Sequence, residues 1–254
     1  MGRALNENAF LSSMVKFNVI ERAAFSTCLT RRGGSLSLGG SGLAARSNHT
    51  TPYQDLSQQQ YHFEPMRFAD LQRQAGKGLY SLQIRKVYVG EICITCGNSG
   101  NQKMAETSFR AGRGGLLDTG TTDTFFPKNA LPAFQEAWEK ITDFAMQERR
   151  LYRYDEFLRI PDITMVFTPN ASLVIPATSY MENVPFVGPG KTNTTIFVQP
   201  DAVQPWTGLR RLIMRIYCEE KAGATLGANS LYHYDVLYDL EANRVGLAKS
   251  NCGS

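Results

Sequence analysis

The sequence lacks the features that mark membrane-spanning and nucleic-acid-binding proteins. No run of apolar residues approaches the length of about 20 that a membrane-spanning helix requires. The first residues show no cationic start followed by an uninterrupted apolar stretch, so no signal peptide is visible. The formal net charge is +4, but lysine and arginine are scattered and form no basic stripe, which argues against nucleic-acid binding. The one dense basic cluster, Arg149, Arg150 and Arg153, lies among aromatic residues and is predicted to be a solvated face.

Histidine and cysteine are also scarce, with three and five residues respectively. The segment Cys93-Ile94-Thr95-Cys96 has the spacing of half a zinc site or of a redox pair, but the sequence has no second CxxC motif and no histidine near this one. Because a zinc site needs about four ligands, we expect no metal site and favour a local or cross-loop disulfide. The odd number of cysteines leaves at least one thiol outside intramolecular pairs.

Glycosylation sequons and cysteines point to the secretory pathway. Acceptor sequons begin at Asn48, Asn170 and Asn193, and five cysteines allow up to two disulfides. Together with the absent leader, they predict a secreted, vacuolar or lysosomal protein whose N-terminal part is missing from this sequence.

The apolar pattern predicts an antiparallel, β-rich fold. With 254 residues, 43% of them hydrophobic, the chain can form a substantial core. Residues 31–60 are rich in glycine, serine and polar residues and are expected to form a loop or linker with a short strand at 35–38. Alternating or apolar runs predict strands at residues 79–90, 163–167, 173–175, 212–218, 236–240 and 245–248. Asn243 lies between the last two strands and suits a left-handed turn conformation.

One helix is predicted among these strands. Asn129 can cap it, and three- and four-residue spacing places its apolar residues on one buried face: Leu131, Phe134, Trp138, Ile141 and Ala145.

Residues 114–127 are the segment that suggests a catalytic role. Two leucines precede Asp118-Thr119-Gly120-Thr121-Thr122, and an aromatic pair and Pro127 follow. A carboxylate delivered by an apolar strand needs hydrogen-bond donors, because an unpaired buried charge is strongly unfavourable. Thr119, Thr121 and the Gly120 amide are the available donors. A bare Asp-Thr-Gly also fits an ordinary β-turn, so the longer context decides between the two interpretations.

That context resembles the second catalytic segment of pepsin-like aspartic proteases, in which the same turn precedes a helix. The resemblance extends to the plant-type, nepenthesin-like members and covers about residues 8–254, with residues 41–75 and 93–113 least similar. It rests on three further groups of segments: residues 25–29 with 33–40, residues 80–90, and the closing runs 224–229, 234–239 and 243–248.

The resemblance implies a mainly β fold, the antiparallel C-terminal lobe of a pepsin-like acid protease with short helices. Residues 1–78 would be a remnant of the N-terminal lobe with the interlobe linker, and residues 79–254 the catalytic lobe. Asp118 would be the C-terminal catalytic aspartate and Thr121 would steady its outer oxygen, while Thr119 would bond across to the opposite lobe. Gly227 would pack against the active-site turn, although Thr225 replaces a more usual aliphatic residue.

The resemblance also implies further properties of the chain. Cys28 and Cys252 match positions that are bridged in some members of the family. The activity would be peptide hydrolysis by two aspartates without a cofactor, acting on peptide or protein substrates.

The second aspartate of such a pair is absent, since no other Asp-Thr-Gly or Asp-Ser-Gly occurs in the sequence. We therefore expect a chain that requires the missing N-terminal lobe and is inactive alone. The alternatives are a non-catalytic relative that binds or inhibits another protein, and a homodimer in which each copy supplies Asp118. The intact turn disfavours the first alternative, and the long asymmetric lobe disfavours the second.

Overall fold

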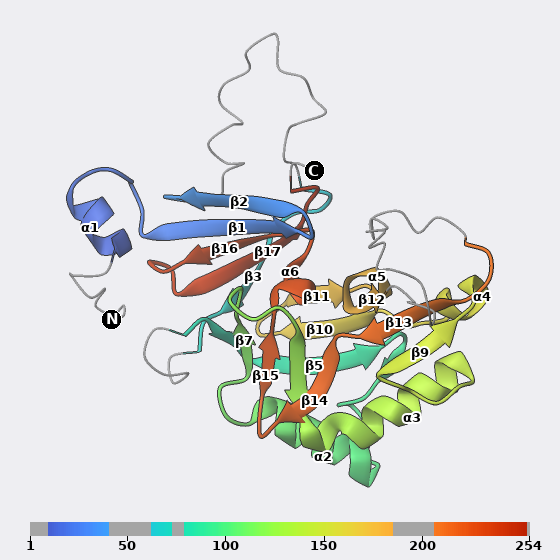
Figure 1. Ribbon diagram of the computed structural model, residues 1–254. Coiled ribbons are helices and arrows are strands. Elements are labelled where there is room, and N and C mark those ends of the chain that lie inside the picture. The colour runs from blue at the N-terminus through green and yellow to red at the C-terminus, as the bar shows by residue number, and fades with distance from the viewer. Residues whose placement is uncertain (1–9, 41–61, 73–78, 185–205, 253–254) are drawn as a thin grey trace.

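Four β-sheets form the framework of the part of the chain that the computed structural model describes, residues 10–40, 62–72, 79–184 and 206–252 (Figure 1). Most neighbouring strands are antiparallel, and the helices are short. The prediction of a mainly β fold of antiparallel strands with short helices is therefore confirmed. None of the helices among these residues has the length and apolar character needed to cross a membrane.

The first sheet joins segments from both ends of the chain. Its order is β2 (Gly33–Leu38), β1 (Ala24–Thr30), β16 (Tyr234–Asp239), β17 (Arg244–Lys249) and β3 (Arg67–Asp70). All of its pairings are antiparallel. The turn between β16 and β17 places Asn243 at φ 54°, which confirms the predicted left-handed conformation. Strands from both sides of residue 78 thus share one sheet, while the proposed division there remains a prediction.

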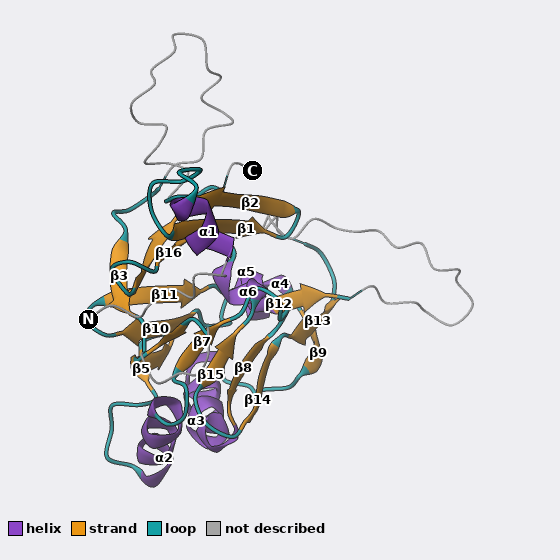
Figure 2. Cartoon of the chain, turned by 90° about the vertical axis from the view of Figure 1, so that its left-hand side faces the viewer, coloured by secondary structure: helices purple, strands orange, loops and turns teal. Residues whose placement is uncertain are grey.

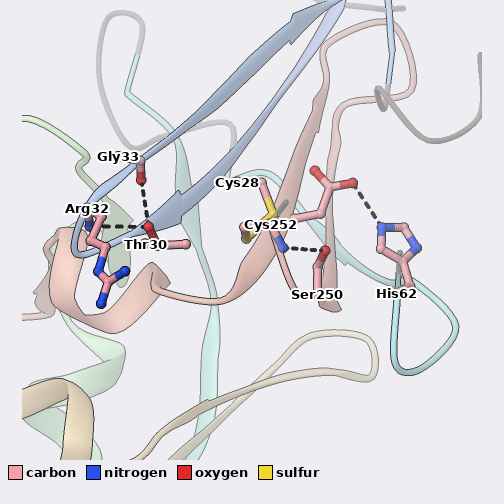
Figure 3. The surroundings of a disulfide bond; sticks show 8 residues. Cys28, Thr30, Arg32, Gly33, His62, Ser250 and Cys252 are labelled. Carbon is pink, nitrogen blue, oxygen red and sulfur yellow. Dashed lines mark hydrogen bonds and ion pairs between the residues drawn. A yellow bond between two sulfur atoms is a disulfide. The ribbon is translucent and has the colours of Figure 1, made fainter. Parts of the chain in front are cut away.

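A disulfide and a polar pair with a buried carboxylate connect strands of this sheet to the segments that flank it (Figure 3). Cys28 on β1 is bonded to Cys252, close to the described end of the chain. His62 Nε2 lies 2.9 Å from Asp235 Oδ2, and the Asp235 carboxylate is almost completely buried. These contacts hold β1, β16 and the residues before β3 together.

The second and third sheets build the body of the molecule. The second contains β11 (Ala171–Ile175), β10 (Ile163–Phe167), β5 (Ile84–Val89) and β6 (Ile92–Cys93), and the third contains β12 (Met181–Asn183), β13 (Arg210–Met214) and β9 (Arg149–Tyr152). The strand predicted at 163–167 is confirmed with its exact bounds. The one predicted at 79–90 forms two strands, because the pairing changes sheet at Gln83.

The fourth sheet carries the Asp118 segment and departs from the antiparallel pattern. Its order is β14 (Ile216–Glu220), β8 (Thr124–Pro127), β15 (Ala224–Leu226), β7 (Gly115–Leu117) and β4 (Ser81–Leu82). The β14–β8 and β15–β7 pairs are parallel. The single strand predicted at 212–218 is interrupted at Arg215, where the chain passes from the third sheet to the fourth.

The two longer helices lie together at the end of the molecule opposite β1 and β2 (Figures 1 and 2). They are α2 (Gly100–Arg110) and α3 (Leu131–Thr142). The shorter ones are α1 (Phe10–Lys16), α4 (Tyr154–Phe157), α5 (Ala177–Tyr180), α6 (Ala228–Leu231) and the 3₁₀ turn η2 (Lys128–Ala130). The core lies between these helices and the sheets. Its largest fully buried side chains include Trp138, Phe126, Phe134, Phe167 and Met165.

The predicted helix exists, but both of its expected ends are wrong. Asn129 does not cap it, because Asn129 lies within the preceding 3₁₀ turn and α3 begins after it without a side-chain cap. The helix ends when Asp143 adopts a left-handed conformation at φ 64°. Ala145 is consequently outside the helix and exposed instead of buried.

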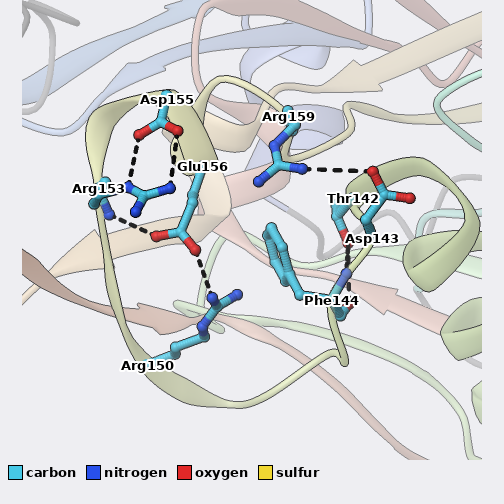
Figure 4. Close-up of polar contacts among 8 residues, drawn as sticks. All are labelled: Thr142, Asp143, Phe144, Arg150, Arg153, Asp155, Glu156 and Arg159. Atoms are coloured by element: carbon cyan, nitrogen blue, oxygen red, sulfur yellow. Dashed lines mark hydrogen bonds and ion pairs between the residues drawn. The ribbon is translucent and has the colours of Figure 1, made fainter.

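The basic cluster is only partly the solvated face that was predicted (Figure 4). Arg153 is largely exposed and pairs with the exposed Asp155. Arg150, in contrast, is 24% exposed, donates to Glu156 Oε1 at 2.6 Å and stacks over the Phe144 ring at 4.1 Å. The aromatic neighbours were a sign of this packing, because an arginine stem and guanidinium can cover aromatic rings.

Asp239 anchors the end of β16 to two neighbouring segments. Its Oδ2 accepts from Arg22 Nη2 at 2.9 Å and from Arg244 Nε at 3.1 Å, and its Oδ1 accepts from the Ala242 N–H at 3.1 Å. Burial acts to raise the pKa of Asp239, but the Ala242 N–H and the two arginines outweigh burial and lower the pKa below its ordinary value.

We predict that Asp239→Asn destabilises the chain most at near-neutral pH. A carboxyl group with a lowered folded-state pKa stabilises fully above its unfolded pKa of about 4, and this contribution is lost as pH falls through the folded value. Urea unfolding at about pH 6 should show a loss of about 2 kcal/mol, shrinking toward zero below about pH 3. The exposed Asp70→Asn on the same sheet is the control, and equal stability of Asp239→Asn and wild type at pH 6 would contradict the prediction.

Candidate active site

The structure places Asp118 immediately after β7, at the start of the turn that leads into β8. Its carboxylate is half-buried, and each oxygen accepts one hydrogen bond. The Gly120 N–H donates to Oδ1 at 3.0 Å, and the Thr121 hydroxyl donates to Oδ2 at 2.7 Å. Two of the three predicted donors therefore contact the carboxylate, and both oxygens keep lone pairs that can accept from water or substrate.

Thr119, the third predicted donor, does not contact the Asp118 carboxylate. Its side chain is exposed, and its hydroxyl has no hydrogen-bond partner among the described residues. An outward hydroxyl beside the carboxylate is free to bond to another polypeptide surface, so the cross-lobe role of Thr119 stays a prediction.

Strand β15 holds the turn by passing between β7 and β8. The Asp118 N–H donates to the Leu226 carbonyl at 3.0 Å, and the Ala228 N–H donates to the Thr121 carbonyl at 2.7 Å. The backbone on both sides of the carboxylate is thus bonded to residues around the end of β15, and Asp118 cannot shift without breaking these contacts.

Gly227 lies where this strand meets the turn and has no room for a side chain. A Cβ atom at this position would be 2.1 Å from the Asp123 carbonyl oxygen and 2.8 Å from that of Thr121. Its φ of −75° is ordinary, so space and not conformation requires glycine here. Gly227 therefore lies directly against the backbone of the Asp118 turn, where it was predicted to pack.

A buried polar network beneath the turn was not expected from the sequence. The Thr124 hydroxyl is fully buried, donates to Asn229 Oδ1 at 2.7 Å and lies 2.5 Å from Ser230 Oγ. Asn229 Nδ2 donates to the Arg215 carbonyl at 2.9 Å. The sequence does show a threonine before the aromatic pair and two polar residues shortly after Gly227. It does not show that these side chains hydrogen-bond to one another.

A second network explains why threonine occupies position 225, where an aliphatic residue was expected. Thr225 is buried, donates to Glu220 Oε1 at 2.6 Å and accepts from Arg113 Nη2 at 3.0 Å. Arg113 also lies 3.1 Å from the same Glu220 oxygen. Because Arg113 precedes β7, this triangle fixes the register of β7 against β15.

A cluster of three charged side chains, Arg215, Glu182 and Asp123, lies at the other end of the turn. Arg215 ion-pairs with Glu182, and its Nη1 is 3.9 Å from Asp123 Oδ2. Burial raises the pKa of Asp123, and Glu182 adds to this, while Arg215 lowers it only in part. Asp123 is therefore more easily protonated than an ordinary aspartate.

A cavity of about 260 Å³ opens beside Asp118 and Thr119. Its other walls are mainly apolar and come from β1, β7, β16 and the residues before β4: Phe25, Thr27, Leu79, Tyr80, Leu116, Leu117 and Tyr238. Phe25 and Tyr238 stack at 4.5 Å between ring centroids. The carboxylate thus lies at the side of an apolar cavity and not in open solvent.

The other predicted sites can be located in part. Asn170 is exposed in the turn between β10 and β11, whereas Asn48 and Asn193 lie outside the described residues. Cys93 is bonded to Cys96, and Cys218 is a half-buried free thiol. In the described ranges, no group of three or more histidine, cysteine, aspartate or glutamate side chains is arranged to hold a metal ion.

Comparison with known families agrees with this geometry. The family model described as eukaryotic aspartyl protease matches residues 3–250. No curated protein matches the sequence.

We predict that Gly227→Ala destabilises the chain by about 3 kcal/mol, because the added methyl group would collide with two backbone carbonyls that cannot move independently. Gly100→Ala is the matched control, since nothing lies within 4 Å of an added Cβ at this exposed position in α2. Urea unfolding followed by circular dichroism measures both variants. Equal midpoints for the two variants would show that Gly227 does not pack as described.

Proposed function

The chain belongs to the eukaryotic aspartyl protease family, and on this premise we propose that Asp118 is one of two carboxylates that together hydrolyse peptide bonds. The observation that carries the proposal is the hydrogen-bonded position of Asp118 beside an apolar cavity. The family implies peptide substrates, and the cavity offers apolar walls next to the reactive group.

The chemistry requires two carboxylates with different protonation. Two such groups placed close together share a proton, because like charges at short distance cannot both ionise readily. The ionised group takes a proton from a water molecule, which attacks the peptide carbonyl, while the protonated group donates to the carbonyl oxygen. In this chain, Gly120 and Thr121 hold the plane of the Asp118 carboxylate so that both oxygens keep a fixed direction.

The second carboxylate is proposed to come from a companion lobe that covers the cavity. The sequence contains one Asp-Thr-Gly and no Asp-Ser-Gly. The apolar face of the first sheet continues outward from the cavity, since Phe25 is paired with Leu38 and Thr27 with Leu36, and directly opposite residues share a face. Leu36 is 63% exposed and Leu38 is 39% exposed. A partner seated there would bury these leucines and reach Thr119 and Asp118.

The proposed location is the secretory pathway, with an extracellular, vacuolar or lysosomal destination. The exposed turn at Asn170 is accessible for glycosylation, and a disulfide joins Cys28 to Cys252.

We predict that the 254-residue chain alone cleaves an acid-protease peptide substrate no faster than its Asp118→Asn variant. Supplying in trans an N-terminal lobe of a pepsin-like protease, with its own Asp-Thr-Gly, should produce cleavage at acid pH. Asp118→Asn should then reduce the rate by about 10²- to 10⁴-fold, the usual contribution of a general acid or base. Asp155→Asn, at an exposed site on α4, is the matched control and should keep the restored rate.

Three results would contradict parts of this proposal. Cleavage by the isolated chain that a statine-type inhibitor blocks would remove the need for a companion, and sedimentation as a dimer would then identify a second copy as the source of the other carboxylate. Unchanged restored activity in Asp118→Asn would exclude Asp118 as a catalytic residue. Tight binding of another protein without any cleavage would favour the non-catalytic alternative.

A further inference from the structure

The two disulfides among the described residues differ in their access to solvent. Cys28 and Cys252 are 2% and 5% exposed, so their bond is buried. Cys96 is exposed and its partner Cys93 is half-buried. Thiol–disulfide exchange requires a thiolate to reach a sulfur atom, and access therefore distinguishes the two bonds.

The residues between Cys93 and Cys96 keep the motif in place. Ile94 and Thr95 are both buried. The Ile94 N–H donates to the Val87 carbonyl at 2.9 Å, and the Val87 N–H donates to Thr95 Oγ1 at 2.9 Å. These bonds do not depend on the disulfide, so both sulfurs would remain neighbours after it opens.

Thr95 also favours one of the two sulfurs as the leaving group. Its hydroxyl accepts from Val87 and so has its own hydrogen available, and it lies 3.8 Å from Cys93 Sγ. A hydroxyl proton directed at Cys93 stabilises negative charge that develops there when Cys96 is attacked.

We infer that Cys93 and Cys96 form a thiol–disulfide exchange site for small thiols of the glutathione class. The thiolate of the small thiol bonds to Cys96 Sγ, the Cys96–Cys93 bond breaks, and its electron pair goes to Cys93 Sγ, which takes a proton from solvent. A second small thiol then attacks the mixed disulfide, releasing the small-molecule disulfide and leaving two protein thiols. The protein gains two electrons, and the two small thiols lose them.

Reduction of the Cys93–Cys96 bond is expected to loosen the segment that leads into the N-terminus of α2. Gln102 Nε2 donates to the Cys93 carbonyl at 3.1 Å, and Ser99 Oγ accepts from the Gln102 N–H at 3.3 Å as the cap of this helix. Opening the disulfide removes a covalent constraint on the segment between Cys93 and this cap. The site is independent of Asp118 and does not rest on the proposed protease activity.

The first experiment measures reduction of the folded chain by reduced glutathione near neutral pH, with acid quenching, alkylation and peptide mass mapping. The Cys93–Cys96 bond should open at least about tenfold faster than Cys28–Cys252, because Cys96 is exposed whereas Cys28 and Cys252 are both buried. Amide hydrogen exchange across residues 97–103 should increase in the reduced protein. Equal rates for the two disulfides, or complete protection of Cys93–Cys96, would overturn the inference.

The second experiment identifies the attacked sulfur with a matched pair of variants in a Cys218→Ser background. Cys93→Ser keeps the exposed Cys96, and Cys96→Ser keeps the half-buried Cys93. With oxidised glutathione, the Cys93→Ser variant should form the mixed disulfide at least about tenfold faster. Equal or reversed rates would contradict attack at Cys96. If either variant fails to fold, peptide mapping of the mixed disulfide trapped in the wild-type chain identifies the attacked sulfur, and the small thiol on Cys93 would contradict attack at Cys96.

Cys218 is removed in that background for clarity and does not compete in the wild-type chain. It is half-buried on β14, and burial raises the pKa of its thiol to about 12. Near neutral pH it stays protonated and is a poor nucleophile.

Discussion

The close approach of Gly227 to the backbone of the Asp118 turn is the contact on which the rest of the candidate site depends. Because Gly227 has no Cβ to collide with the turn, β15 can lie between β7 and β8 and form backbone hydrogen bonds to the turn. The Leu226 carbonyl and the Ala228 N–H then fix the backbone on either side of the carboxylate. The Gly120 N–H and the Thr121 hydroxyl, which donate to the carboxylate oxygens, complete a position that these backbone contacts have already set.

Two buried threonines stabilise the arrangement of the strands around the Asp118 turn. Thr124 and Thr225 each occupy a buried strand position, and each has polar partners on other elements. A buried hydroxyl is stable only when it is hydrogen-bonded, so such a residue selects one strand register over others that would bury the same apolar area. The site therefore combines a tight backbone contact with polar groups that prevent slippage of its strands.

One apolar face of the first sheet is covered by the body of the molecule at one end and open at the other. The strands β16 and β17 place apolar side chains against the body, whereas β1 and β2 extend that face outward from Phe25 in the cavity wall to Leu38 and Leu36 on β2. Exposed apolar side chains on the same sheet face as the wall of the Asp118 cavity are the arrangement expected of a surface that a partner covers. The proposed need for a second carboxylate and the open sheet face thus lead to the same part of the molecule.

Local patterns in the sequence determined the strand at 163–167, the left-handed Asn243, the helix that packs Phe134 and Trp138, and the Asp118 turn, because each depends on residues close together in the chain. Tertiary structure alone decided where the strand predicted at 212–218 breaks, since Arg215 is held by Tyr180, Thr124 and Asn229 from other elements. It likewise decided that Arg150 is packed against Phe144 and that Thr225 has charged partners. These outcomes depend on contacts between distant segments, and the energy of such contacts is not expressed in any local spacing of residue types.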